Sequence, residues 1–552
     1  MHAAGITRFC FLPLVAACIA AFTPTVSAGV ELPGKQTIEK VDFERHVMGL
    51  FGRMGCNSGS CHGSFQGKNG FRLSLFGYDP EKDFLALTRD VQGRRINSRD
   101  PDDSLLLLKA TGQVSHGGGR RISRDSWQYD LFRRWIADGA KWSKGSGDVK
   151  EIILTPSEYA FSGPDQSGQM EVRARFADGT EENITSLCDF RINDDSVAEV
   201  TPLGQVKSLR PGDTALVVSY RGNVLAARVL VPTPAATGFK YPDVPENNYL
   251  DKEVFAKLRR LNVVPSDLTG DTEFLRRVTI DTIGCLPSPE EVRAFVDDKS
   301  ADKRAKKIEQ LLNHPMHAAL WATKLSDITG NNTVEMEGQG PMQAKLSQMW
   351  HDWLRKRIAE NRPYDELVHD IVCATSRDGL QPEEWLKQFK AIEEAAGKGF
   401  ETPYPDRQTL DLFWRRRNAN VPLEQWGEKA AAAFLGVRLE CAQCHKHPFD
   451  RWTQADYRAF ANVFGQVSYA ASPDAKSAID GENAERKKAA AGNNKLQPLQ
   501  VREVFISDQA RSLANPDVKQ SLPAKALGGP PIKVEKGKDA RVELFQWLRA
   551  PD

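Results

Sequence analysis

The chain has 552 residues, of which 40% are hydrophobic and 27% are charged, with 74 basic and 73 acidic side chains. This composition is that of a soluble globular protein with several domains, and it excludes a disordered or membrane-spanning chain. The balanced charge also excludes a nucleic-acid-binding protein, which would need a clustered excess of basic residues.

Residues 1–28 are predicted to be a signal peptide that is removed on export. Arg8 gives a short positive region, FCFLPLVAACIAAF is an apolar stretch too short to span a bilayer, and VSA ending at Ala28 is a cleavage site. An alternative interpretation takes LVAAC as a lipoprotein signal with Cys18 as the lipidated residue. In both cases we expect an exported protein, periplasmic or at the cell surface, with no transmembrane segment.

Residues 40–143 are predicted to be helical and rich in loops. VDFERHVMGLF and SWQYDLFRRWIADGAKW carry apolar residues at helical spacing, and Gly139 can end the second of these helices. Between them, GKNGFRLSLFGYDP and SHGGGRR are glycine-rich segments. We expect these segments to be loops packed around a common centre.

Residues 150–232 change character and are predicted to form a small β-sandwich. MEVRARFADGTEENITS and TALVVSYRGNVLAARVLV alternate apolar and polar residues, and ADGT, PLGQ, RPGD and YRGN supply turns at short intervals. The length is that of an immunoglobulin-like module. Cys188 has no partner cysteine within it, so we expect no disulfide between its sheets.

Residues 245–465 are predicted to form a larger, mostly α-helical domain, since several segments repeat apolar residues every three to four positions. Residues 383–405 read as an acidic insertion that contains lysine. Residues 466–552 are poorly periodic and read as a linker with strand fragments such as VREVFI, followed by the start of a C-terminal domain that is cut short.

Export leaves seven cysteines, an odd number that is too small for a disulfide scaffold. They are Cys56, Cys61, Cys188, Cys285, Cys373, Cys441 and Cys444. Two pairs are close in sequence and each is followed directly by a histidine. The other three are expected to be buried and to act as small hydrophobic residues.

Residues 441–447 read CAQCHKH, which contains the C-x-x-C-H pattern of c-type haem attachment. Cys441 and Cys444 would form thioethers with the porphyrin vinyl groups, and His445 would bind the iron. A local disulfide and a zinc site are the alternatives. Zinc would need a second Cys/His pair, and His447 offers only one more ligand.

Residues 56–62 contain the same elements with two extra residues, as Cys56, Cys61 and His62 in the pattern C-x4-C-H. Glycine and serine make this loop flexible enough to close a disulfide instead. The second motif, the export signal and the flanking helices favour a second haem c site, although it is the weaker of the two.

A sixth iron ligand for the first site is expected from the intervening loops. His116 in SHGGGRR is the first candidate, because the glycines after it let the backbone approach a haem, and Met54 is the second. For the second site His351, His369 and Met349 are open alternatives, as is an iron with no sixth protein ligand.

The chain resembles three known kinds of module. GCNSGSCHGSFQGKNGFRLSLFGYDPEKDFLALTRD, SLLLLKATGQVSHGGGRR and LFRRWIADGAKW resemble a planctomycete-type cytochrome c domain. RFADGTEENITS and DDSVAEVTPLGQVKSLRPGDTALVVSY resemble the bacterial immunoglobulin-like group 2 domain. LNVVPSDLTGDTEFLRRVTIDTIGCLPSPEEVRAF, RPYDELV and FLGVRLECAQCHKHPFDRWTQADYRAFANVF resemble the uncharacterised helical domain that accompanies such cytochrome domains.

The resemblance implies a multidomain α plus β protein with a helical cytochrome c-like domain, an immunoglobulin-like β-sandwich and a larger helical domain. Cytochrome domains of this kind often carry an Arg-Met-Pro-Pro segment before the last helix, where the methionine is the sixth ligand. Here HGGGRR takes that place. The resemblance therefore implies ligation by His62 and His116, and a lower reduction potential than His/Met ligation would give.

Three functions are compatible with these patterns. The first is an exported dihaem electron-transfer protein with an unidentified redox partner, in which the immunoglobulin-like module is a spacer or contacts a surface polymer or protein. The second is an enzyme, haem-dependent or hydrolytic, for which HPFDRW with His447, Asp450 and Asp456 gives a weak hint of acid–base chemistry. The third is a surface adhesion protein whose cysteine pairs form disulfides.

Overall fold

The computed structural model describes residues 29–64, 66–338, 340–415, 421–447, 450–489, 499, 501–515 and 519–551. The expected signal peptide, including Cys18, lies outside these residues, as do residues 448 and 449 of HPFDRW. The described chain is mixed α and β, with separate sheets and a helical C-terminal half. This confirms the coarse fold class expected from sequence.

The N-terminal region is built from short helices joined by loops, as its spacing predicts. A hairpin that the sequence did not predict precedes them, β1 (Val30–Leu32) and β2 (Gln36–Ile38). The helices are a π-helical turn η1 (Phe43–Val47) continuous with α1 (Met48–Arg53), then α2 (Pro80–Thr88), α3 (Leu105–Ala110) and α4 (Trp127–Ala137), with short 3-10 turns η2 (Leu75–Gly77), η3 (Asp90–Gly93) and η4 (Pro101–Asp103) between them. Gly139, with φ +92°, follows α4 as expected.

The β-rich region contains three small sheets. The strands are β3 (Val149–Thr155), β4 (Glu158–Ala160), β5 (Ser167–Gln169), β6 (Glu171–Phe176), β7 (Glu181–Asn183), β8 (Asp189–Ile192), β9 (Ala198–Val200), β10 (Gln205–Ser208), β11 (Gly212–Tyr220) and β12 (Asn223–Val231). The sheet orders are β3-β6-β7, β4-β12-β11-β8 and β5-β10-β9, antiparallel except for the β4–β12 pair. Arg221 and Gly222, with φ values of 47° and 73°, close the β11–β12 hairpin, so the YRGN turn is confirmed.

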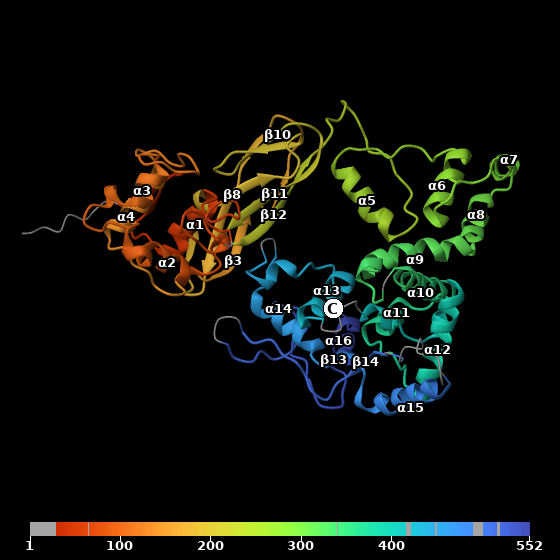
Figure 1. The fold of residues 1–552 in the computed structure, drawn as a ribbon. Helices are drawn as coiled ribbons and strands as arrows, with labels where there is room; N and C mark the ends of the chain where they lie inside the picture. Colours follow the sequence, from red (N-terminus) through yellow and green to blue (C-terminus); the bar gives the residue numbers. More distant parts are fainter. Residues whose placement is uncertain are drawn as a thin grey trace, which may run out of the picture.

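The N-terminal helices lie against the sheets (Figure 1). The two parts share one hydrophobic core. Phe43 and Leu50 from the helices belong to the same buried cluster as Val172 on β6 and Val218 on β11. The Tyr220 hydroxyl also donates a hydrogen bond of 2.8 Å to the carbonyl of Arg45. The first 200 described residues therefore form one packed body, in which the helical part is held against the sheets.

The C-terminal half is helical, with one small sheet. Its helices are α5 (Tyr249–Arg260), α6 (Asp271–Ile283), α7 (Pro289–Asp297), α8 (Lys303–Leu312), α9 (Pro315–Thr329), α10 (Pro341–Ala359), α11 (Tyr364–Val372), α12 (Pro382–Lys398), α13 (Leu423–Phe434), α14 (Gln454–Ala461), α15 (Pro473–Ala489) and α16 (Ala540–Arg549), and β13 (Val467–Ala470) pairs with β14 (Glu503–Ile506). Helices α5–α8 form an arm that leads from the sheets to the body made by α9–α16 (Figure 1).

The segments expected to be an insertion and a linker are part of this body. α12 covers most of residues 383–405 and buries Trp385, which belongs to a cluster shared with α15. Val504 on β14 and Leu544 on α16 are buried in the main core of the helical body. The described part of residues 466–552 is therefore not a linker, and α16 docks back on α11. The strand expected at VREVFI is confirmed as β14.

Among the described residues, no helix combines the length and apolar character needed to cross a bilayer.

Candidate functional site

A cavity of about 810 Å³ lies in the N-terminal region, directly beside the first cysteine–histidine motif. Its lining includes both motif cysteines, Cys56 and Cys61, together with His62 and the loop histidine His116. The two glycine-rich segments expected to surround a common centre supply much of the rest. The volume lies in the range of small-molecule and cofactor pockets, about 300–1,000 Å³.

The motif loop is held by its own backbone hydrogen bonds. The Cys56 amide donates to the Phe51 carbonyl at 2.9 Å, which continues α1 into the loop, and the His62 amide donates back to the Cys56 carbonyl at 3.0 Å. Gly63 is required here, because a Cβ atom at this position would lie 2.0 Å from the carbonyl oxygen of Asn57. The four residues between the cysteines thus form a compact turn that presents Cys61 and His62 to the cavity.

The His62 ring is oriented by Phe71, which follows it in the glycine-rich segment. Nδ1 of His62 lies 3.0 Å from the Phe71 carbonyl oxygen, and the two rings pack with their centroids 4.6 Å apart. A carbonyl can only accept, so Nδ1 carries the proton and Nε2 keeps a lone pair for a metal. Burial, with a smaller contribution from His116, lowers the pKa of His62 and favours this neutral form.

His116 has the same arrangement on the facing loop. Its Nδ1 lies 2.9 Å from the Gly119 carbonyl oxygen, which again places the proton on Nδ1 and leaves Nε2 available. Neither Nε2 atom makes a hydrogen bond within the described residues. The rings of His62 and His116 are parallel within 5°, with centroids 6.2 Å apart. Met54, the second candidate for a ligand, also lines the cavity.

The cysteine thiols are free in the described residues, in both motifs and at the three isolated positions. Burial raises the pKa of Cys56 to about 12, so this thiol stays protonated at neutral pH. Cys188 is buried and its thiol donates to the Ile184 carbonyl at 3.3 Å. Cys285 is exposed and Cys373 is half-buried, so of the three isolated cysteines that were expected to be buried only Cys188 is.

The cavity wall combines apolar side chains with five cations that sequence analysis did not single out. The apolar residues are Phe51, Leu87, Leu105, Leu106, Ala110 and Phe132, and the cations are Lys68, Arg94, Arg95, Lys109 and Arg121. No Asp or Glu is among the lining residues. The residues come from separate loops and helices, so only the fold brings them together. Of the five cations, Lys68 and Arg121 lie in the two glycine-rich segments noted in the sequence.

Two of these cations are used by the protein itself. The buried Arg95 donates to the carbonyls of Ala86 at 2.6 Å and Gly70 at 2.8 Å, and its guanidinium lies 4.6 Å from the centre of the Phe71 ring. Arg95 therefore supports the ring that orients His62. Lys109 donates to the carbonyl of Ser115, immediately before His116.

The second motif is in a different environment. Cys441 and Cys444 are exposed, at the 3-10 turn η9 (Glu440–Gln443), and His445 is half-buried with Nδ1 2.6 Å from the Lys446 carbonyl oxygen. Lys446 extends to the β11–β12 turn, where its Nζ donates to the Gly222 carbonyl at 3.2 Å. The motif therefore lies where the helical body meets the sheets.

The three residues considered as further ligands for the second motif have other contacts in the helical body. Met349 is buried in the core, and His351 on α10 lies 3.3 Å from the Thr323 hydroxyl and 3.4 Å from the Ala319 carbonyl on α9. His369 packs its ring edge-on against Phe545 on α16. None of these three residues therefore has a described contact that places it beside His445.

The carboxylates near HPFDRW have structural roles. Asp456 forms a capping box with Thr453 at the start of α14, in which the Thr453 hydroxyl accepts from the Asp456 amide at 3.1 Å. Asp450 accepts from the Arg451 amide at 2.7 Å, and Nε2 of His447 lies 3.0 Å from the Arg438 carbonyl. Helix capping accounts for Asp456 without an acid–base role.

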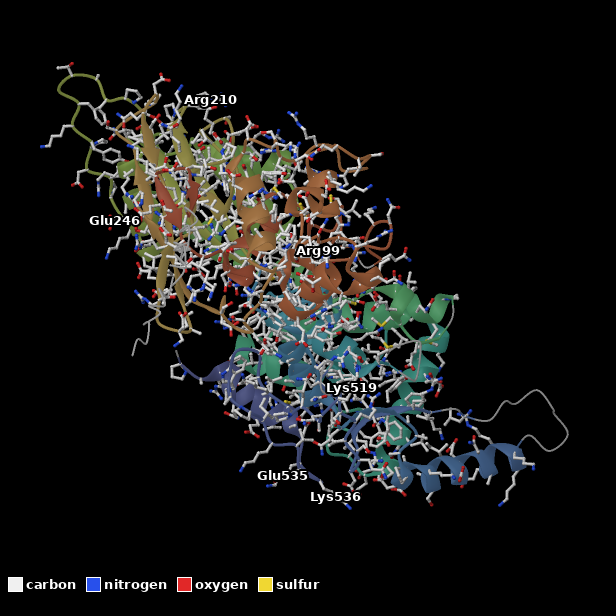
Figure 2. All side chains as sticks on the ribbon, turned by 90° about the vertical axis from the view of Figure 1, so that its left-hand side faces the viewer. Arg99, Arg210, Glu246, Lys519, Glu535 and Lys536 are labelled. Carbon is white, nitrogen blue, oxygen red and sulfur yellow. The ribbon has the colours of Figure 1, made fainter. Side chains whose placement is uncertain are left out.

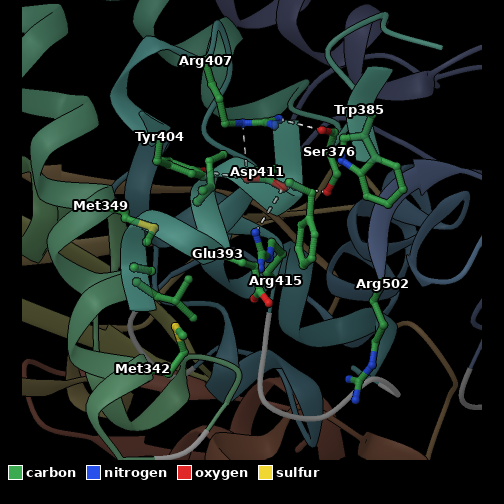
Figure 3. Close-up of a pocket in the computed structure, with 14 residues that line it drawn as sticks. Met342, Met349, Ser376, Trp385, Glu393, Tyr404, Arg407, Asp411, Arg415 and Arg502 are labelled. Atoms are coloured by element: carbon green, nitrogen blue, oxygen red, sulfur yellow. Dashed lines mark hydrogen bonds and ion pairs between the residues drawn. The ribbon is translucent and has the colours of Figure 1, made fainter. Parts of the chain in front are cut away.

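A second, much smaller cavity of about 20 Å³ lies in the helical body (Figure 3). The buried Asp411 accepts hydrogen bonds of 2.6 Å from both Ser376 and Tyr404, with Arg407 and Arg415 beside it. The volume is about that of one water molecule. Ser376 Oγ also accepts from the Val504 amide at 2.8 Å, so this cluster ties β14 to the helices. We interpret it as a structural network.

Among the described residues, no group of three or more His, Cys, Asp or Glu side chains is arranged to hold a metal ion. One comparison with known proteins identifies part of the chain. Residues 249–469 match a known family. It is the PSCyt2 family, described as a protein of unknown function (DUF1549). The match confirms the expected helical domain of unknown function, with nearly the same bounds, and covers less than half of the chain. No curated protein matches the chain.

The cytochrome c-like and immunoglobulin-like assignments of residues 40–143 and 150–232 stay predictions. The PSCyt2 family carries no stated activity, so function has to be argued from the cavity.

Proposed function

We propose that the chain is an exported c-type haem protein that transfers electrons, with its better-formed haem site in the cavity at Cys56, Cys61, His62 and His116. One observation carries the proposal: both thiols and both imidazoles of this set line a single cavity of about 810 Å³. A local disulfide between Cys56 and Cys61 would need neither the cavity nor the second histidine.

The spacing of the two histidines supports this assignment. An imidazole–metal bond is about 2 Å long, so two imidazoles that share one metal ion must be held with their rings several ångströms apart. The rings of His62 and His116 are 6.2 Å apart. The carbonyl acceptors at both Nδ1 atoms give the required tautomer.

The residues present fit haem c in their chemistry. Cys56 and Cys61 would hold it by thioether bonds, and His62 and His116 would bind its iron. Haem held by these four residues would supply one-electron redox chemistry, and iron ligation by two protein side chains is typical of electron transfer. Two histidine ligands would give a lower potential than His/Met ligation.

Cys441, Cys444 and His445 are proposed as a second haem c site. The C-x-x-C-H spacing supports it, whereas the exposure of both thiols makes it the less enclosed of the two. This reverses the order expected from sequence, where the regular spacing made the second motif the stronger. Export to the periplasm or cell surface, with the β-rich region as a spacer or contact module, is part of the same proposal.

The test is covalent haem in protein made with a cytochrome c maturation system and denatured before analysis. We expect haem that stays with the polypeptide on a denaturing gel and a pyridine haemochrome spectrum of the thioether type. A chain that carries no covalent haem under these conditions would overturn the proposal.

A further inference from the structure

The cations of the cavity wall point to the charge of its ligand. Five lining residues are basic and none is acidic, in a chain whose formal net charge is only +1. An excess of this kind around an otherwise apolar cavity is unfavourable in an empty site, because like charges repel one another. A bound anion would offset this repulsion.

Three of the five cations have no role within the protein that would explain them. The side chains of Lys68 and Arg94 make no hydrogen bond or ion pair within the described residues, and the Arg121 side chain has only a 4.0 Å contact with the Cys61 sulfur. All three side chains are exposed, at the mouth of the cavity. Arg95 and Lys109, by contrast, are bonded to backbone carbonyls.

We propose that Lys68, Arg94 and Arg121 bind the carboxylates of a flat, largely apolar ligand whose body occupies the cavity. The apolar wall takes the body of such a ligand, and the cations at the mouth take its anionic edge by charge-assisted hydrogen bonds. The inference rests on the proposed function. In that function the ligand is haem, and its carboxylates are the propionates of the porphyrin. It adds that the orientation of the ligand is set by charge, with its carboxylates toward solvent.

The test uses the full-length chain made without haem maturation, and a porphyrin that can neither react with thiols nor bind imidazoles. Metal-free mesoporphyrin IX meets both conditions and carries two carboxylates, and its dimethyl ester has the same body without charge. Fluorescence titration gives the Kd of each. We expect the diacid to bind at least tenfold more tightly than the ester, with a preference that falls as salt is added.

Three substitutions, Lys68→Gln, Arg94→Gln and Arg121→Gln, are then combined. The triple variant should lose the preference for the diacid and keep its affinity for the ester, since the apolar wall is unchanged. Arg99→Gln is the matched control: Arg99 is an exposed cation of the same region that does not line the cavity (Figure 2). It should behave as the native chain does.

Equal affinity of the native chain for diacid and ester would overturn the inference, as would a triple variant that keeps the full preference. This result is separable from the proposed function. A native chain that prefers the diacid but takes up no covalent haem during maturation would support the carboxylate site and overturn haem c attachment. A chain that takes up covalent haem but shows no preference for the diacid would support haem c attachment and overturn the carboxylate site.

Discussion

The imidazole rings of His62 and His116 are parallel, with their centroids 6.2 Å apart, although 53 residues lie between them in the chain. Each ring is fixed through Nδ1 by a carbonyl on its own loop, Phe71 for His62 and Gly119 for His116. Two unconnected loops thus present matched metal-binding nitrogens to one cavity. This relationship is the basis of the functional proposal and gives the first prediction.

Replacement of His116 by alanine should convert the first haem from a low-spin to a high-spin species, because one axial position opens. Absorption and EPR spectra of matured protein measure this directly. His116→Met should restore a low-spin spectrum with a higher potential, since methionine ligation raises it. His314→Asn is the control, because asparagine keeps the acceptor that caps α9. An unchanged low-spin spectrum in His116→Ala would show that another residue, such as Met54, is the ligand.

The two cysteine pairs should contribute one haem each. Cys56→Ser with Cys61→Ser should lower the mass of the matured chain by one haem, and Cys441→Ser with Cys444→Ser should lower it by another. Mass spectrometry of the denatured chain counts them. Cys188→Ala, at a buried free thiol outside both motifs, should leave the count unchanged. If only the replacement of Cys56 and Cys61 lowers the haem count, the second motif has another role.

Asp83 on α2 should make the protein less stable as the pH rises. Its carboxylate is buried, accepts from the Ser74 hydroxyl at 2.7 Å and also from the Ser74 amide, and burial raises its pKa to about 7. The unfolded chain loses this proton near pH 4 and the folded chain only near pH 7. The unfolded state therefore binds fewer protons between these values, and the contribution of Asp83 to the free energy of unfolding falls by about 2–4 kcal/mol across that window.

Asp83→Asn mimics the protonated carboxyl and should remove this contribution. Urea unfolding of both proteins at pH 4 and at pH 8 gives the comparison. The other carboxylates contribute equally to the pH dependence of both proteins, so their contributions cancel in the difference. At each pH the free energy of unfolding of the native chain is subtracted from that of the variant. We expect this difference to be about 2–4 kcal/mol larger at pH 8 than at pH 4. A difference that does not change with pH would contradict the burial of a neutral Asp83.

Arg45 should be essential for holding the N-terminal helices against the sheets. It is 7% exposed and makes ion pairs of 2.5 Å with Asp178 and with Glu182 on β7. Its guanidinium lies 4.0 Å from the centre of the Phe176 ring. Arg45→Leu removes both ion pairs and the contact with Phe176, and urea unfolding should show a free energy of unfolding lower by about 1.5–3 kcal/mol, the usual cost of losing buried hydrogen bonds to charged groups. Arg191→Leu, which breaks an exposed pair with Asp189, should cost about 1 kcal/mol or less.

The sequence was informative where the signal is local. Helical spacing located α4, the YRGN turn located the β11–β12 hairpin, and cysteine–histidine spacing located both motifs. His116 was found because a histidine followed by three glycines lies where a methionine was expected. Each of these inferences needs only neighbouring residues.

What the sequence missed depends on contacts between distant segments. Arg94 and Arg121 reach the same cavity from different loops, and nothing in the spacing of basic residues marks this. The segment after residue 466 lacks periodicity because its buried residues, such as Val504 and Leu527, come from a short strand and irregular loops that pack on helices already formed. The exposure of Cys441 and Cys444 was likewise not visible in their spacing.

The central claim is tested most directly by the haemochrome and low-temperature EPR spectra of the matured chain with Cys441 and Cys444 replaced by serine. Only the cavity site can then hold haem. The account predicts one covalently bound, fully low-spin haem with two nitrogenous axial ligands. A matured chain of this variant with no covalent haem, or with a high-spin iron, would contradict it.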